Sequence, residues 1–404
     1  MFRTTLFVAL VATSAMAADL AWPQFRGPSG RAVSTEVGLP DKIAPGENER
    51  WVVDLPGRGL SCAVIADGRI YLTANSGLDQ SRLHVLAYST AGKKLWERQL
   101  WVTGQTFCHP VTCMACPTVA TDGKLVHALF ATGDLMSLTT DGEVRWVRSL
   151  LSEFPNMINH VGRSSSPVLA GDVLIVLMEN QGESYLLGID ANSGTTKWKQ
   201  PRQSAQNNWI TPLVIESHGS QLVLVPSYDG MTAYEARTGE VKWKYGDEGL
   251  HVIPSPTPVG EGELVLAPSM KGLDVMRPGE AKVDVVWKSP KLRLANASPL
   301  AADGKVYCLS KNSLTCADLT DGKSLWELRV KGPFWASPVL ADGKIYMVSD
   351  EGVVTVVKLG KEGTVLSTGE MKEPIYATPA VAESSIFLRS DKHLWCFGIA
   401  KKTS

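Results

Sequence analysis

A tryptophan recurs along the chain four residues after a glycine, and this repeat limits the possible folds more than any other feature of the sequence. Internal similarity at a period of 20–50 residues indicates a solenoid, a propeller or an array. Trp51 stands in a similar segment with no copy before it, and Trp287 follows a longer turn after Gly279. The tryptophans of the series are Trp51, Trp96, Trp146, Trp198, Trp243, Trp287 and Trp326.

A second repeated mark, a small residue followed by proline, lies between the tryptophans. Each mark precedes a short apolar run, often an Asp-Gly turn, and then an alternating strand, which is the pattern of a β-hairpin. From Pro117 onward the prolines are 39–50 residues apart. The marks are Cys116-Pro117, Ser166-Pro167, Thr211-Pro212, Thr257-Pro258, Ser298-Pro299, Ser337-Pro338 and Thr378-Pro379, with Ser61-Cys62 as a degenerate first copy.

These units predict an all-β fold, because no window of twelve residues has a helical period and each unit has the size of a four-stranded propeller blade. The marks number eight, but the last copy ends after three strands. The strand near Trp51 supplies the missing fourth and closes the ring, which removes the exposed sheet edges. We therefore predict an eight-bladed propeller over residues 50–398, with seven blades as the alternative. Residues 18–49 form an extended N-terminal arm and residues 399–404 a C-terminal tail.

The repeat resembles the pyrroloquinoline-quinone (PQQ) repeat, through its small-Pro start, its Asp-Gly hairpin and endings such as "DGKSLWE" and "TGEVKWK". This resemblance to PQQ-like, quinoprotein-type propellers covers about residues 50–398. It implies the architecture shared by quinoprotein dehydrogenases and the outer-membrane assembly propeller BamB. The repeat residues dock neighbouring blades, so the resemblance implies a fold and does not by itself imply that PQQ binds.

Residues 1–17 have the features of a secretory signal peptide. Arg3 is followed by an apolar run at residues 6–12, which is too short to span a bilayer, and residues 15–17 (Ala-Met-Ala) fit a cleavage site. The first cysteine is Cys62, so we expect no lipid anchor on a cleaved N-terminal cysteine. The sequence therefore predicts an exported protein without a transmembrane segment, located in the periplasm or outside the cell.

The charge balance excludes a bulk nucleic-acid binder, since 40 Lys and Arg residues face 41 Asp and Glu residues. The seven cysteines are an odd number, so at least one stays unpaired unless chains cross-link. Cys113 and Cys116 have the spacing of a possible loop-stapling disulfide, with packed thiols as the alternative. No metal site is predicted, and we expect a monomer.

The connectors before the small-Pro marks are the candidate binding elements, because in a propeller they lead into the innermost strands and line one mouth of the channel. Their aromatic, amide, imidazole and guanidinium side chains suit recognition of a peptide or a polar ligand. The alternative is that they plug the channel or pack between blades. The candidate residues are His160, Arg163, Asn208, Trp209, His251, Asn296, Trp335 and Tyr376.

Three functions follow as hypotheses. The first is a non-catalytic binding or scaffold protein that presents the channel mouth to a protein or a small ligand, with no catalytic residue and no expected cofactor. The alternative is an alcohol or sugar dehydrogenase dependent on PQQ and Ca²⁺, which the family resemblance implies. The sequence lacks the vicinal Cys-Cys pair of that family and has no calcium triad that can be mapped. A weaker alternative is a polysaccharide-binding propeller.

Overall fold

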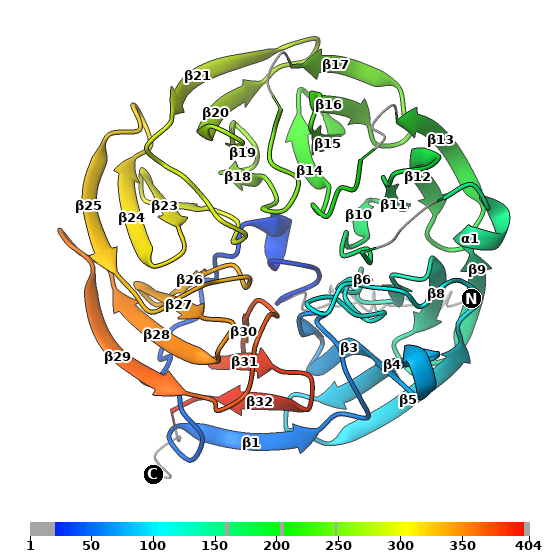
Figure 1. Cartoon of the computed structure of the whole chain (residues 1–404), viewed down its shortest axis with the longest axis horizontal. Helices are drawn as coiled ribbons and strands as arrows, with labels where there is room; N and C mark the ends of the chain where they lie inside the picture. The colour runs from blue at the N-terminus through cyan, green and yellow to red at the C-terminus, as the bar shows by residue number, and fades with distance from the viewer. Residues whose placement is uncertain (1–20, 158–160, 203–205, 247–248, 400–404) are drawn as a thin grey trace, which may run out of the picture.

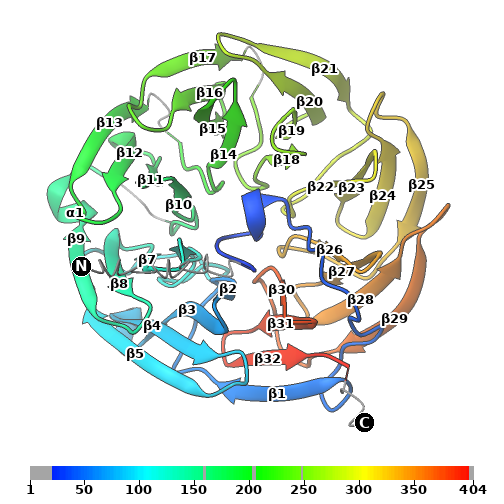
Figure 2. The same cartoon turned by 180° about the vertical axis from the view of Figure 1, so that it is seen from behind.

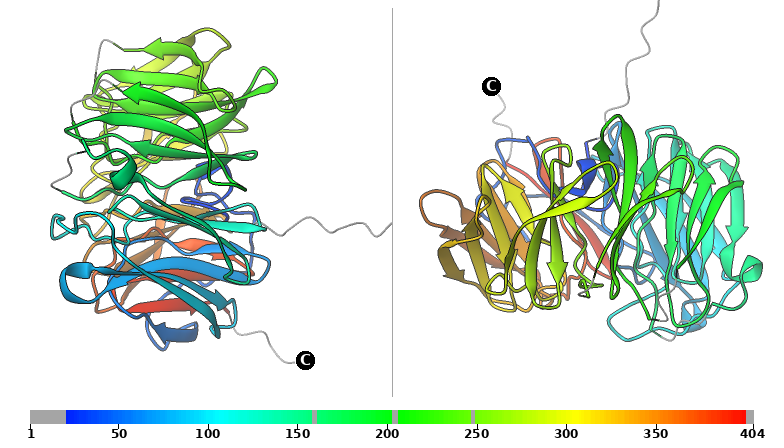
Figure 3. Two further views of the ribbon diagram at one scale, coloured as in Figure 1. Left: turned by 90° about the vertical axis from the view of Figure 1, so that its right-hand side faces the viewer. Right: turned by 90° about the horizontal axis from the view of Figure 1, so that it is seen from above.

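The computed structural model describes residues 21–157, 161–202, 206–246 and 249–399, and these residues form a ring of eight four-stranded antiparallel sheets (Figure 1). Each sheet runs outward from the centre of the ring, and the side view shows a thick disc (Figure 3). The predicted eight-bladed propeller is confirmed, and the seven-bladed alternative is wrong. The described helical segments are α1 (Leu150–Glu153) and two short 3-10 turns, Pro28–Gly30 and Leu78–Gln80.

We number the blades 1 to 8 in chain order, from the innermost strand outward. Blade 1 consists of β2 (Val64–Ala66), β3 (Arg69–Ser76), β4 (Arg82–Ser89) and β5 (Lys94–Trp101), and blade 2 of β6 (Ala120–Thr121), β7 (Leu125–Leu129), β8 (Asp134–Thr139) and β9 (Val144–Ser149). Blade 3 consists of β10 (Val168–Ala170), β11 (Val173–Met178), β12 (Ser184–Asp190) and β13 (Thr196–Arg202), and blade 4 of β14 (Leu213–Ser217), β15 (Ser220–Ser227), β16 (Gly230–Glu235) and β17 (Val241–Tyr245).

Blades 5 to 8 follow the same order, and the outermost strand of blade 8 comes from the N-terminal side of the chain. Blade 5 consists of β18 (Thr257–Val259), β19 (Leu264–Ser269), β20 (Gly272–Pro278) and β21 (Val283–Ser289), and blade 6 of β22 (Leu300–Ala302), β23 (Lys305–Leu309), β24 (Ser313–Asp318) and β25 (Ser324–Arg329). Blade 7 consists of β26 (Val339–Ala341), β27 (Lys344–Val348), β28 (Val353–Lys358) and β29 (Thr364–Glu370), and blade 8 of β30 (Ala380–Ala382), β31 (Ser385–Arg389), β32 (His393–Phe397) and β1 (Glu49–Asp54).

Asp-Gly pairs set the register of three inner hairpins. Asp67, Asp303 and Asp342 have φ values of 47°, 50° and 52°, and the glycine after each is also left-handed. Two successive residues with positive φ make the type I′ turn whose twist matches that of paired strands. The middle strands lie between neighbouring blades and are buried on both faces, as in β11, whereas β1 alternates between half-buried and exposed positions.

The two ends of the ring are joined by β1, which pairs with β32 and places Trp51 opposite Cys396. This pairing confirms the predicted closure, and Figure 1 shows the blue β1 on the outside of the red blade 8. Because β1 and β32 lie more than 300 residues apart in sequence, blade 8 forms only when both ends of the ring are present. The closure leaves no gap between blade 8 and blade 1.

The repeated tryptophans hold consecutive blades together. Six of them, the ones from Trp51 to Trp287, donate a hydrogen bond of 2.8–3.0 Å from the indole Nε1 to a backbone carbonyl in the next blade. Blade 7 has Ser367 at the tryptophan position, and its hydroxyl donates a 2.5 Å hydrogen bond to the carbonyl of Asp41 in the arm. The arm thus covers the outer strand of the one blade that lacks the indole.

The arm crosses one face of the ring before it reaches blade 7 (Figure 2). Trp22 is fully buried and exchanges two 2.9 Å backbone hydrogen bonds with Ile65 of β2. Arg26 donates to the carbonyls of Pro256 and Pro299, which precede β18 and β22. Further along, the backbone at residues 32–34 pairs with Leu340 of β26. The arm therefore closes one end of the central channel.

No helix in the described part of the chain has the length and apolar character that a membrane span requires.

Candidate functional site

A cavity of about 400 Å³ occupies the centre of the ring, and its floor is Phe25 of the arm. At the opposite end, connector residues that line the cavity reach the surface: His109 is exposed and Trp209 is half-buried. We call this end the mouth. The wall contains apolar groups, hydroxyls, two thiols, one amide and one imidazole. The lining residues are Phe25, Leu60, Cys62, His109, Val111, Thr112, Cys116, Thr118, Val161, Ser164, Ser166, Trp209, Thr211, Ile253, Ser255, Asn296, Ser298, Trp335, Ser337, Tyr376 and Thr378.

A ring of hydrogen bonds runs around this cavity from blade to blade. In each step a backbone N–H at the start of one blade donates to the hydroxyl oxygen at the same position of the next blade, at 2.9–3.2 Å. The ring members are Cys62, Thr118, Ser166, Thr211, Ser255, Ser298, Ser337 and Thr378. Seven of the eight members are thus hydroxyl acceptors that fix one blade relative to the next, and the eighth member is Cys62.

Two of the predicted marks were placed two residues away from the true ring position. In blade 2 the ring hydroxyl is that of Thr118, and Cys116 belongs to the connector. In blade 5 it is Ser255, so the mark is Ser255-Pro256 rather than Thr257-Pro258. The error arose because the sequence Ser-Pro-Thr-Pro offers two equivalent marks, and because no proline follows Thr118.

Four of the eight candidate residues do line the cavity, namely Trp209, Asn296, Trp335 and Tyr376. All four are half-buried, so each presents part of its side chain to the channel. The indole Nε1 of Trp209 donates a 3.0 Å hydrogen bond to the carbonyl of Gly162 in the preceding connector.

Three other candidates do not line the cavity. Asn208 is buried and donates to Glu179 Oε2 at 3.1 Å and to the carbonyl of Pro226 at 2.7 Å. Arg163 donates to the carbonyl of Ala131 at 2.8 Å. Nδ1 of His251 accepts from a backbone N–H at 3.3 Å, and burial lowers the pKa of this imidazole. The eighth candidate, His160, lies outside the described residues.

The floor and one side of the cavity consist of residues that the repeat does not indicate. Phe25 comes from the arm, whose path across the ring has no signature in the repeat. His109, Val111 and Thr112 come from the connector between blades 1 and 2, which contains the dense cysteine cluster. The unusual length of that connector, with a repeat distance of 56 residues from Cys62 to Thr118, was the available signal.

All seven cysteines are free thiols in the structure, so Cys113 and Cys116 have the arrangement of the packed-thiol alternative rather than that of the possible disulfide. Cys113 is buried, and desolvation raises the pKa of its thiol to about 12. Desolvation also raises the pKa of the Cys116 thiol, which lines the cavity. Protonated, buried thiols are poor nucleophiles, so they contribute to packing in this state.

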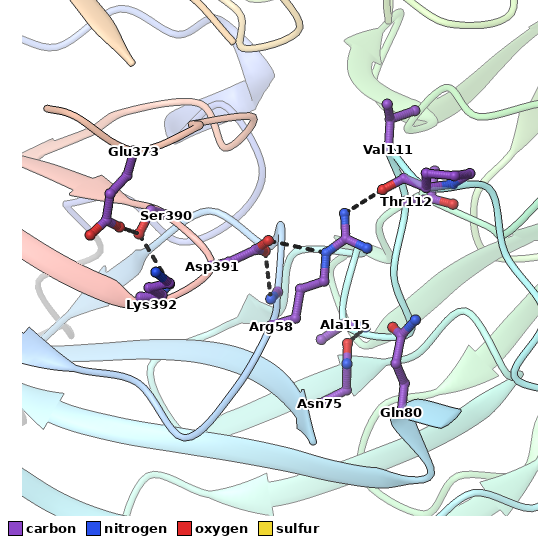
Figure 4. Close-up of polar contacts among 12 residues, drawn as sticks. Arg58, Asn75, Gln80, Val111, Thr112, Ala115, Glu373, Ser390, Asp391 and Lys392 are labelled. Carbon is purple, nitrogen blue, oxygen red and sulfur yellow. Dashed lines mark hydrogen bonds and ion pairs between the residues drawn. The ribbon is translucent and has the colours of Figure 1, made fainter. Parts of the chain in front are cut away.

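Arg58, which precedes blade 1, links blade 8 to the connector between blades 1 and 2 (Figure 4). Arg58 Nε lies 3.1 Å from Asp391 Oδ2 of blade 8, and Arg58 Nη2 donates to the carbonyl of Pro110 at 2.5 Å. The same connector is held from blade 1, where Asn75 Oδ1 accepts from the N–H of Ala115 at 3.0 Å. Polar contacts thus hold the connector between blades 1 and 2, which forms this side of the cavity wall, against blades 1 and 8, where the ring closes.

The cavity does not provide the donors that a calcium-bound quinone needs. Ca²⁺ takes six to eight oxygen ligands, several of them carboxylates. Among the described residues that line the cavity, none is an aspartate or a glutamate. Among the residues that the structure describes, no group of three or more His, Cys, Asp or Glu side chains is arranged to hold a metal ion. The wall therefore does not fit Ca²⁺ together with PQQ.

Solved propellers of low sequence identity share the fold. BamB from Moraxella catarrhalis has a TM-score of 0.63 at 19% identity, over 88% of this chain and 98% of that one. A quinohemoprotein alcohol dehydrogenase from Comamonas testosteroni has a TM-score of 0.70 at 12% identity, over 95% and 82%. A europium-containing methanol dehydrogenase has a TM-score of 0.70 at 11% identity, over 92% and 96%. At these identities the likeness establishes the fold alone.

No curated protein matches the chain in sequence. A family model described as outer membrane protein assembly factor BamB matches residues 43–245, 186–284 and 274–366. The matches overlap because each part of the model fits more than one copy of a repeat, and together they cover the ring from β1 to β29. The chain therefore belongs to this BamB-type family of PQQ-like β-propellers.

Proposed function

We propose that this protein is an exported, non-catalytic binding protein that takes a small ligand, or a segment of a protein partner, into the open mouth of the propeller channel. The observation that carries the proposal is the cavity of about 400 Å³ with Trp209, Trp335 and Tyr376 at its mouth and Phe25 at its floor. Ligand sites of this kind are concave, mostly apolar and lined by a few fixed polar groups. Connectors on a rigid ring are well suited to hold such groups.

The chemistry of the wall favours binding over catalysis. The imidazole in the described lining is that of His109, whose Nδ1 accepts a 3.3 Å hydrogen bond from the N–H of Val111. Among the described lining residues, no carboxylate orients this ring or acts as a general base. The family description names an assembly factor, which supports a protein as the partner. The features of residues 1–17 support export to the periplasm or beyond.

A ligand-observed NMR screen of the mature protein tests the proposal. The library contains small acids, amides and amines, oligosaccharides and unstructured peptides. We expect hits that disappear in Trp335→Ala and persist in Trp101→Ala, whose indole is 62% exposed and lies outside the cavity. A screen without hits, or hits that Trp335→Ala leaves unchanged, overturns the proposal.

A calorimetric titration with PQQ and CaCl₂, followed by dye reduction with simple alcohols, tests the dehydrogenase alternative. We expect no turnover, since the wall lacks the calcium ligands. One-to-one binding with turnover would replace the binding function by a dehydrogenase.

A further inference from the structure

Three buried arginines lie close to the wall of the channel cavity. Arg26 follows Phe25, which forms the floor, and Arg163 precedes Ser164, which lines the side. Arg389 donates from Nη1 to both oxygens of Ser61, the residue before Cys62. All three side chains are at least nine-tenths buried. Three buried guanidinium groups therefore belong to residues that are next in sequence to, or hydrogen-bonded beside, residues that line the cavity.

Among the described residues, no carboxylate acts on Arg26 or Arg163, whereas Arg389 feels the charge of Asp391, the ion-pair partner of Arg58. Each arginine donates to backbone carbonyls, and Arg389 also donates to a hydroxyl. In the part of the chain that the structure describes, none of them lies within ion-pair distance of an acid. One nitrogen on each, Nε of Arg26 and Arg163 and Nη2 of Arg389, is buried without a hydrogen-bond partner. A buried charge is costly unless a counter-charge accompanies it.

The guanidinium groups of Arg26 and Arg163 remain charged at neutral pH. Desolvation lowers the pKa of Arg26 to about 9 and that of Arg163 to about 10. Both values are above 7, so the positive charges persist in the folded protein. Among the described residues, no aspartate or glutamate lines the cavity to offset them. Two carboxylates outside the lining, Asp350 and Asp391, act on Tyr376 at the mouth. Because Coulomb interactions are strong where water is excluded, we expect the buried guanidinium groups to favour an anion deeper in the channel, near Arg26 and Arg163.

The hydroxyl ring adds hydrogen-bond donors to these charges. Five of its members use the hydroxyl oxygen as an acceptor, and no contact between described residues uses the hydroxyl proton. These protons can turn toward a ligand in the channel without breaking the ring. The five members are Ser166, Thr211, Ser255, Ser298 and Ser337. The remaining two hydroxyls, those of Thr118 and Thr378, lie beside the Cys62 thiol.

We propose that the channel selects small organic anions, namely carboxylates with an aromatic or apolar body. The carboxylate lies against the ring of hydroxyl donors, in the field of Arg26 and Arg163, and the apolar body lies among Trp209, Trp335 and Tyr376. This inference rests on the proposed binding function and defines the ligand class of the same site. A neutral or cationic molecule of the same shape makes the apolar contacts without the charge complementarity.

The test uses three probes with one aromatic body: 2-naphthoate, 2-naphthamide and 2-naphthylmethylammonium. Their affinities for the mature protein are measured by calorimetry at pH 7 and low salt. We expect 2-naphthoate to bind at least about tenfold more tightly than 2-naphthamide, as for hydrogen bonds to a charged group, and the ammonium probe to bind least. This comparison needs no variant, so it does not depend on the folding of a mutant.

Variants then identify the source of the selectivity. Arg26→Gln and Arg163→Gln each remove one buried charge, and we expect each to reduce the preference for 2-naphthoate severalfold. Arg237→Gln removes an exposed arginine in the turn after β16 and serves as the control, with an unchanged preference. Equal binding of 2-naphthoate and 2-naphthamide would overturn the anion inference and leave the binding function standing. Failure of all three probes would also overturn it, and the NMR screen would then decide the proposed function separately.

Discussion

The indole Nε1 of Trp198 donates a 3.0 Å hydrogen bond to the backbone carbonyl of Ala236, one blade further along the chain. Trp198 is 8% exposed, and its ring lies directly against Gly239 of the same turn. A side chain on Gly239 would occupy the space of the indole, so the glycine and the tryptophan of consecutive copies require each other. This explains why the two residues repeat together.

Gly239→Ala tests this dependence against a glycine without a tryptophan neighbour. Both Gly239 and Gly219 have positive φ, 74° and 79°, so alanine is strained at each. We expect Gly219→Ala to cost about 1 kcal/mol of the free energy of unfolding, from backbone strain alone. A Cβ on Gly239 would lie 2.5 Å from Trp198 Cδ2, so we expect Gly239→Ala to cost about 3 kcal/mol or more. Nothing lies within 4 Å of a Cβ on Gly219.

Urea unfolding followed by far-UV circular dichroism measures both variants, because this signal follows the loss of the β-sheet backbone of the ring. Equal losses at the two positions would show that the indole moves aside without cost, and would remove the glycine–tryptophan pair as the reason for the repeat.

The arm makes a separate prediction, because it is both the floor of the cavity and part of the core. Trp22→Ala removes a fully buried indole, and we expect a loss of about 3–5 kcal/mol in the free energy of unfolding. Val37→Ala lies in the same arm at a position that is 65% exposed, and we expect a change within about 0.5 kcal/mol. Thermal and urea unfolding of both variants check this. A small effect of Trp22→Ala would mean that the arm does not hold the ring together.

The fold could be predicted from the sequence because its determinants are local and repeated. The glycine-to-tryptophan step and the Asp-Gly turns recur in most copies, and the orphan Trp51 together with the incomplete last copy indicated the ring closure. The four cavity residues that were predicted correctly stand at equal distances before the ring position, so the repeat located them. Trp209 and Trp335 are two of them.

The rest of the site depends on contacts between segments far apart in sequence. Nothing near Phe25 indicates that the arm crosses the channel, since its position is fixed by the hydrogen bonds of Arg26 to Pro256 and Pro299. Asn208 and Arg163 have side chains suited to a ligand, but their partners, such as Glu179, are visible only in the folded chain. A repeat gives the positions of side chains along a blade but not the direction in which each one points.

We predict that the contacts of Arg58 protect the thiols of the cysteine-rich connector between blades 1 and 2 from modification. Arg58→Met removes the contacts with Asp391 and with the carbonyl of Pro110, so we expect the connector to open more often. Modification of its thiols by 5,5′-dithiobis(2-nitrobenzoate) should then become about three- to tenfold faster, with the half-buried Cys108 reacting first. Lys93→Met, at an exposed position on the outside of blade 1, is the control. Equal rates in wild type and Arg58→Met would show that other contacts hold the connector.

We predict that the folded protein loses stability in mild acid because His127 is buried. Its imidazole is fully buried between β-strands, neither ring nitrogen has a hydrogen-bond partner among the described residues, and burial lowers its pKa to about 4. The unfolded chain takes up a proton on this residue below about pH 6.5, whereas the folded protein does so only near pH 4. The unfolded state therefore binds more protons between these two values, and stability falls as the pH falls through that window.

His127→Phe keeps the ring that packs near Trp146 and removes the titration, so it isolates this effect. Between pH 7 and pH 4.5 we expect the wild type to lose about 2–3 kcal/mol more of its free energy of unfolding than the variant does. His218→Asn, at an exposed turn position with φ of 50°, should lose as much as the wild type. Urea unfolding at the two pH values gives the comparison. If His127→Phe loses as much as the wild type, the acid sensitivity resides in other groups and the buried imidazole does not control it.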